Sequence, residues 1–150
     1  MRKLFTLVLT AVVAAALVAA PSVAGAQPKP NAFNFTMSGG QVVPGPGDPD
    51  GTANANVSLF FDKPYTVCGA TNPQNVQRPF TALELHRAPA GEAGPVVATL
   101  DPALTGATDA SGCAGIDKKL LQDIQSNPEL YYLDAHNAEF PDGAIRGQLS

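Results

Sequence analysis

The chain has 150 residues, a formal net charge of −4, 14 glycines, 14 prolines and two cysteines. This length is typical of a single domain. The acidic balance argues against nucleic acid as a partner, because binding it requires a basic surface that neutralises phosphates.

The first segment, residues 1–26, has the pattern of a secretory signal peptide. Arg2 and Lys3 precede an apolar run from Leu4 to Ala20, and Ala24-Gly25-Ala26 supplies the small residues that a signal peptidase recognises. A retained membrane anchor is the alternative, but the run is rich in alanine and ends in a proline, whereas a spanning helix needs about 20 strongly apolar residues. We therefore predict cleavage after Ala26, a secreted, periplasmic or cell-envelope product, and no integral membrane segment after cleavage.

Residues 32–150 predict one all-β domain, preceded by a flexible leader at residues 27–31. Apolar and polar residues alternate with period two between clusters of Gly, Pro, Asn and Asp, which is typical of short antiparallel strands. The proline-rich stretch from Gly39 to Gly51 is predicted to be a loop. We expect an antiparallel β-sandwich or Greek-key-like fold with strands at 33–37, 52–61, 65–69, 80–86, 96–100, 130–136 and 144–149.

One segment has a helical period instead. Leu120, Leu121 and Ile124 share one face of a helix that would span residues 117–126. Asp117 is suited to cap its N-terminus, and the following Asn-Pro pair ends it. The sequence therefore predicts a single short helix packed on the β domain.

Cys68 and Cys113 are the only cysteines. An even number of cysteines in an exported chain favours a disulfide. A redox-active or metal-binding thiol pair would favour the C-x-x-C spacing, which is absent. We therefore predict a structural disulfide between them.

Three predicted strands carry polar residues on one face. Residues two apart in a strand point the same way, so each strand presents one polar pair and turns apolar residues towards a core. The pairs are Glu84 and His86, Asp134 and His136, and Arg146 and Gln148. If these strands are neighbours, the pairs form one polar cluster.

The C-terminal segment resembles the closing motif of the CHRD domain, a module named after chordin and found alone in many secreted bacterial proteins. The matching residues are Tyr132, His136, Pro141, Gly143, Ile145, Arg146, Gly147, Gln148 and Leu149. A middle segment resembles the His-Ile-His, Gly and Gly-Pro-Val-Val pattern of the family, at His86, Gly91, Gly94, Pro95, Val96 and Val97. Glu84 replaces the first histidine of that pattern.

The resemblance extends over nearly all of the chain after the signal peptide. Ser38-Gly39 and Asp50-Gly51-Thr52 are similar to the opening motif, although Val42 stands where the family tends to have glutamate. The residues around both cysteines are similar to those of bacterial members, which supports the disulfide. The resemblance implies a secreted β-sandwich-like domain, and the growth-factor role of chordin does not transfer by fold alone.

Three functional interpretations follow, of which the first is favoured. It is a non-catalytic extracellular or envelope module with an unknown partner and no required cofactor, in which the polar cluster is structural. Arg146 would then bridge Asp134 or Glu84, Gln148 would join the network, and both histidines would bond to backbone.

The second interpretation is zinc or copper binding. His86 and His136 would be imidazole ligands, and Asp134 or Glu84 would supply a carboxylate. Glu84 in place of a histidine weighs against copper(I), and a guanidinium at Arg146 would disfavour a cation in the cluster.

The third interpretation is an enzyme in which His136 acts as a base with Asp134 as its partner. The sequence has no nucleophile elbow and no H-E-x-x-H pair. We therefore expect no catalytic activity.

Overall fold

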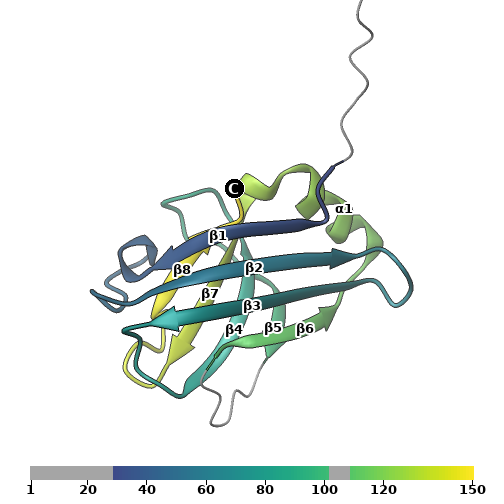
Figure 1. The fold of residues 1–150 in the computed structure, drawn as a ribbon. Coiled ribbons are helices and arrows are strands. Elements are labelled where there is room, and N and C mark those ends of the chain that lie inside the picture. The colour runs from purple at the N-terminus through teal and green to yellow at the C-terminus, as the bar shows by residue number, and fades with distance from the viewer. Residues whose placement is uncertain (1–28, 102–108) are drawn as a thin grey trace, which may run out of the picture.

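The computed structural model describes residues 29–101 and 109–150, so the predicted signal peptide lies outside the described residues. Within them, eight antiparallel strands form one sheet in the order β5-β4-β7-β8-β1-β2-β3-β6. The sheet curls on itself into a nearly closed barrel (Figure 1). The predicted all-β, antiparallel fold class with one short helix is confirmed.

All seven predicted strands are present, and one further strand, β6, was not predicted. The strands are β1 (Ala32–Ser38), β2 (Thr52–Phe60), β3 (Thr66–Gln74), β4 (Phe80–Arg87), β5 (Val96–Asp101), β6 (Ser111–Gly115), β7 (Tyr131–Asn137) and β8 (Ile145–Gln148). The helix is α1 (Lys118–Ser126), and two 3-10 turns, η1 (Gly39–Gln41) and η2 (Pro128–Leu130), complete the elements. β3 also extends well beyond the predicted strand at 65–69.

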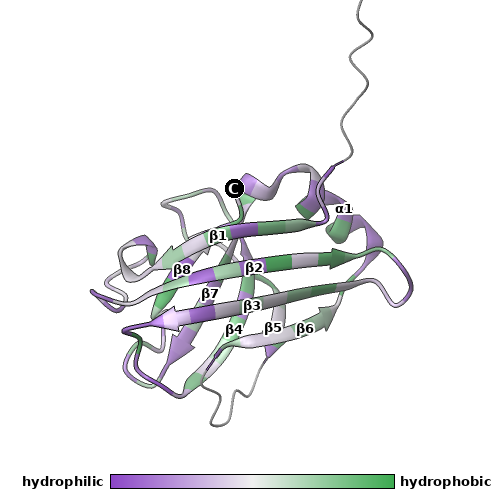
Figure 2. Cartoon of the chain, in the orientation of Figure 1, coloured by the Kyte–Doolittle hydropathy of each residue, from purple (hydrophilic) through white to green (hydrophobic). Residues whose placement is uncertain are grey.

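The core fills the interior of the barrel. Apolar and polar residues alternate along the front strands in Figure 2, as expected for strands with one face inside and one outside. Gly69 on β3 makes room in the interior, because a Cβ there would lie 2.6 Å from Leu100 Cδ1 and also contact Leu83 and Leu133. A side chain at this position would overpack the core.

The two edge strands, β5 and β6, come together where the barrel closes. A Cβ on Gly112 of β6 would lie 2.3 Å from the carbonyl oxygen of Leu100 on β5. The backbones are therefore in direct contact there, although β5 and β6 are not neighbours in the hydrogen-bonded order. This contact covers both edges of the sheet, which otherwise would expose unpaired backbone groups.

α1 covers one end of the barrel, as the sequence predicts. Asp117 caps it by accepting a hydrogen bond from the backbone N–H of Leu120 at 2.8 Å. Leu121 and Ile124 are completely buried. Lys29 donates a hydrogen bond to Ser126 of this helix, so ordered contacts begin within the segment that was expected to be a flexible leader.

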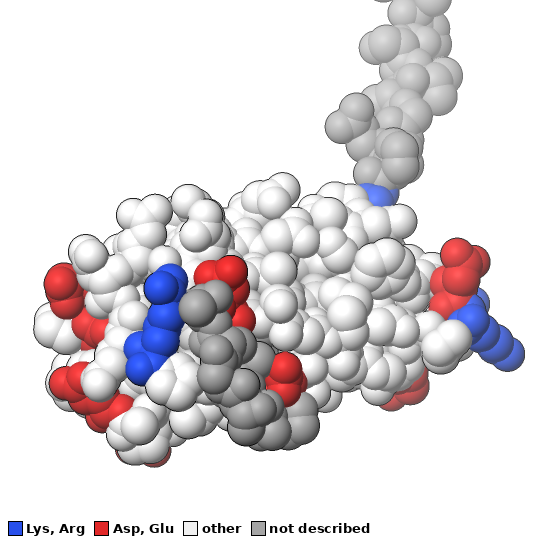
Figure 3. All heavy atoms as spheres, turned by 60° about the horizontal axis from the view of Figure 1, so that its bottom comes forward, with Lys and Arg blue, Asp and Glu red and all other residues white. Residues whose placement is uncertain are grey.

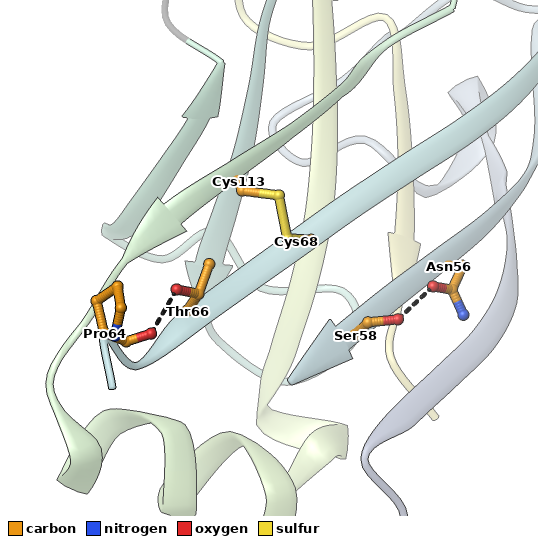
Figure 4. Close-up of a disulfide and its surroundings, with 6 residues drawn as sticks. All are labelled: Asn56, Ser58, Pro64, Thr66, Cys68 and Cys113. Atoms are coloured by element: carbon orange, nitrogen blue, oxygen red, sulfur yellow. Dashed lines mark hydrogen bonds between the residues drawn. A yellow bond between two sulfur atoms is a disulfide. The ribbon is translucent and has the colours of Figure 1, made fainter. Parts of the chain in front are cut away.

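The predicted disulfide is present. Cys68 on β3 and Cys113 on β6 are directly opposite each other in the antiparallel register, with their Cα atoms 4.0 Å apart (Figure 4). The bond joins residues 45 positions apart and links the unpredicted strand β6 to the rest of the barrel.

The exterior carries scattered charges. On the face shown in Figure 3, acidic and basic side chains of the described residues occur in small groups set in a largely uncharged surface, and at one end the two kinds adjoin. Among the described residues, no helix is long and apolar enough to cross a membrane.

Candidate metal centre

The three strands with polar pairs are neighbours in the sheet. β7 lies between β4 and β8, and its Asp134 is opposite Glu84 on one side and Arg146 on the other. The apolar residues Leu83, Leu85 and Leu133 are completely buried in the barrel core. The polar residues therefore lie together on the outer face of β4, β7 and β8.

Glu84, His86 and His136 form the centre of this face. His136 Nε2 lies 3.4 Å from Glu84 Oε2, and His86 Nε2 lies 3.6 Å from the same oxygen. One potential ligand atom from each residue lies within 4.8 Å of the other two. The side chains are 11% exposed for His86, 12% for His136 and 22% for Glu84, so the centre is largely, but not fully, shielded from solvent.

The backbone determines which nitrogen of each imidazole carries the proton. His86 Nδ1 lies 3.0 Å from the carbonyl oxygen of Gly94, and His136 Nδ1 lies 3.0 Å from that of Pro141. A carbonyl oxygen only accepts hydrogen bonds, so each Nδ1 must donate. In the neutral form, both Nε2 atoms then present a lone pair towards Glu84.

These lone pairs have no protein partner. Both Nε2 atoms are buried and make no hydrogen bond. Burial lowers the pKa of His86, although its hydrogen bond to Gly94 and the charge of Glu84 oppose that effect. When His86 is neutral, the lone pair of its Nε2 points at the carboxylate oxygen of Glu84, and the two repel each other. A cation bound between them would attract both atoms.

Asp134 faces Glu84 across the strands but is not part of the ligand group. Its carboxylate lies against the turn at Gly143, where a Cβ would be 2.8 Å from Asp134 Oδ1. Gly143 has a φ of +127°, which also favours glycine. Asp134 is 4% exposed, and burial raises its pKa to about 7, against the opposing effects of His136 and Arg146. Of the two candidate carboxylates, Glu84 is the one that meets both histidines.

Arg146 and Gln148 hold the segment after β4. Arg146 donates from Nη2 to the carbonyl oxygen of Pro89, and Gln148 donates from Nε2 to that of Ala88. Arg146 forms no ion pair with Asp134 or Glu84, so the expected bridge to a carboxylate was wrong. The guanidinium instead stacks on Tyr132, with its central carbon 3.4 Å from the ring centroid. The Tyr132 ring and the carbonyl oxygen of Pro89 are thus the partners of the Arg146 guanidinium, in place of the expected carboxylate.

Comparison with protein families gives one match, to the CHRD domain over residues 33–149. The chain belongs to the CHRD domain family. No curated protein and no solved structure matches the chain.

The CHRD motif segments build this face of the barrel. The closing motif supplies His136, the carbonyl oxygen of Pro141 that orients it, and Arg146, while the middle motif supplies His86 and the carbonyl oxygen of Gly94. The two carbonyls were not predicted as site groups, because backbone atoms leave no residue-specific signal. The proline and glycines of the motifs were the available signal, since they mark the turns that carry these carbonyls.

The donor set matches a zinc site in chemistry, and two of its three ligand-atom separations match the spacing around a tetrahedral ion. Two imidazole nitrogens and one carboxylate oxygen are a known ligand set for zinc. Ligand atoms about 2.0–2.1 Å from a tetrahedral ion lie about 3.3–3.4 Å apart, close to the 3.4 and 3.6 Å that separate the two Nε2 atoms from Glu84 Oε2. The backbone hydrogen bonds of both Nδ1 atoms are the outer interactions that usually orient metal-binding histidines.

Proposed function

We propose that this CHRD domain is an exported, non-catalytic module that binds a divalent zinc ion through Glu84, His86 and His136. The convergence of two buried, unpartnered Nε2 atoms on one carboxylate oxygen carries the proposal. The secretory pattern of residues 1–26 and the Cys68–Cys113 disulfide support export.

Zinc is favoured over copper(I) by the ligand types. Copper(I) prefers soft sulfur ligands, whereas a carboxylate with two imidazoles suits zinc and other divalent ions. Three protein ligands leave one position of a tetrahedral ion for water or for a group from a partner. The domain would then act as a binding module whose contact with other molecules includes the ion.

Arg146 is compatible with a cation at this centre. Its guanidinium stacks over Tyr132, and β7, which carries that ring, lies between β8 and β4. The positive charge is therefore separated from His86 by an aromatic ring.

The test is a zinc titration of residues 27–150 after treatment with a chelator, in competition with a chromophoric zinc indicator at pH 7.5. We expect one zinc ion per chain and a rise in melting temperature, because a ligand that binds only the folded state stabilises it. His86→Ala, His136→Ala and Glu84→Gln should each lose most of the affinity.

Asp134→Asn is the matched control, because Asp134 lies on the same face outside the ligand group. It should retain zinc binding, as should Glu92→Gln at an exposed position. Binding should weaken at pH 5.5, where protons compete for the imidazoles. A wild-type protein that neither binds zinc nor gains stability from it would instead identify the cluster as a metal-free structural network.

A further inference from the structure

Tyr132 lies at the centre of a three-layer stack beside the proposed metal site. Its ring centroid is 4.7 Å from that of His86, and the two rings are inclined by only 13°. The guanidinium carbon of Arg146 lies 3.4 Å from the same centroid. Two planar groups this close to one ring would collide if they lay on the same side of it. His86 is on β4 and Arg146 is on β8, and these strands flank β7 on opposite sides. His86 and Arg146 therefore occupy opposite faces of the Tyr132 ring.

The hydroxyl of Tyr132 is tied to the residue that orients His86. It accepts a hydrogen bond from the backbone N–H of Gly94 at 3.2 Å and also contacts the Gly94 carbonyl oxygen at 3.4 Å. That carbonyl is the acceptor for His86 Nδ1. Any side chain at Gly94 would place its Cβ 2.0 Å from the carbonyl oxygen of Arg87, so the loop can pass this close only with glycine.

Tyr132 therefore restrains His86 in two ways. Its ring face determines the plane of the imidazole, and its hydroxyl holds the carbonyl that determines the tautomer. Both restraints act on the direction in which His86 Nε2 points. A leucine at this position would fill part of the volume, but it has neither a flat face nor a hydroxyl.

We propose that Tyr132 is a positioning residue for metal binding, which holds His86 Nε2 towards Glu84 and keeps the Arg146 guanidinium on the far side of its ring. The inference rests on the proposed zinc site. Without the ring, only the hydrogen bond from Nδ1 to Gly94 would restrain the imidazole. The guanidinium would gain access to Glu84 and compete with the ion for that carboxylate.

The experiment compares zinc affinity and the visible absorption spectrum of the cobalt(II) complex in three variants. Tyr132→Leu removes the ring and the hydroxyl, and we expect about a 10–100-fold loss of zinc affinity with a changed cobalt spectrum, as for other groups that orient metal ligands. Tyr132→Phe keeps the ring and loses only the hydroxyl, so we expect a smaller but measurable loss of zinc affinity, about 3–10-fold. A role in stability alone would change the melting temperature but not the cobalt spectrum.

Tyr131→Phe is the matched control. Tyr131 is the adjacent residue, is completely buried, and donates its hydroxyl to Asp123 of α1 instead of to the site. Its removal should leave zinc affinity and the cobalt spectrum at wild-type values, whatever it does to stability.

The outcomes separate this inference from the proposed function. Wild-type affinity and spectrum in a folded Tyr132→Leu protein would overturn the positioning role and leave the zinc site intact. If Tyr132→Leu does not fold, Tyr132→Phe decides, and a wild-type affinity and spectrum there would overturn the role of the hydroxyl clamp. A wild-type protein that does not bind zinc would remove both proposals.

Discussion

Arg146→Ala is predicted to be the most destabilising of the arginine substitutions in the barrel. Arg146 is 1% exposed, stacks on Tyr132 and donates to the carbonyl oxygen of Pro89. A desolvated cation over an aromatic ring contributes about 2 kcal/mol, and a hydrogen bond from a charged donor contributes about 1.5–3 kcal/mol. Loss of the buried, unpartnered Nη1 relieves part of the desolvation cost. We therefore expect a net loss of about 3 kcal/mol in the free energy of unfolding.

Arg87 and Arg78 are the matched controls. Their side chains are 50% and 44% exposed, and each forms one ion pair at the surface. Arg87 also donates to the hydroxyl of Tyr131, and Arg78 donates to the carbonyl oxygen of Pro73, but these contacts are only partly buried. Interactions of side chains this exposed contribute little to stability, so alanine at either position should lower the free energy of unfolding much less than Arg146→Ala does. The assay is urea denaturation of the disulfide-bonded protein in the presence of a chelator. Equal midpoints for all three variants would refute the structural role assigned to the Arg146 stack.

Two further predictions concern the disulfide and Asp134. Native protein should have no free thiol under denaturant, and reduction of Cys68–Cys113 should cost about 4 kcal/mol on the loop-closure model; labelling of both cysteines without reductant would contradict this. The folded-state pKa of Asp134 is raised from 3.8 to about 7, so the folded state binds the proton more tightly than the unfolded state. Stability should therefore fall as the pH rises from 4 to 7, by at most about 1.4 kcal/mol per pH unit. In chelator, Asp134→Asn should abolish this component of the slope, and an identical pH profile in that variant would show that another group is responsible.

The fold was predictable where side chains alternate in size and polarity. The stretch from Thr52 to Phe61 predicted β2 almost to its ends. β6 was missed because Ser111–Gly115 consists of small residues without an apolar alternation. Its place in the sheet depends on pairing with β3, which the sequence does not encode locally.

The extension of β3 was missed for a different reason. Asn72 and Pro73 look like turn residues in sequence. In the structure β3 pairs with β6 only as far as Ala70, so Pro73 lies where one edge of the strand has no ladder partner. A proline is tolerated at such a position because no N–H is required there.

The candidate site was predictable in composition but not in geometry. The spacing of two residues places Glu84 and His86 on one face of a strand, whatever the fold. Their meeting with His136 depends on the pairing of β4 with β7, which connects segments about 50 residues apart in the chain. The choice between Glu84 and Asp134 depends on the turn at Gly143, which packs against the Asp134 carboxylate, and this contact has no local sequence signal.

X-ray absorption spectroscopy at the zinc edge, on the one-to-one complex, tests the central claim most directly. We predict a four-coordinate ion with ligands about 2.0–2.1 Å away, and the multiple-scattering features of two imidazoles. His136→Ala should retain one imidazole at most. A six-coordinate ion surrounded by oxygen atoms, or a spectrum without imidazole scattering, would contradict the assignment of Glu84, His86 and His136 as the metal site.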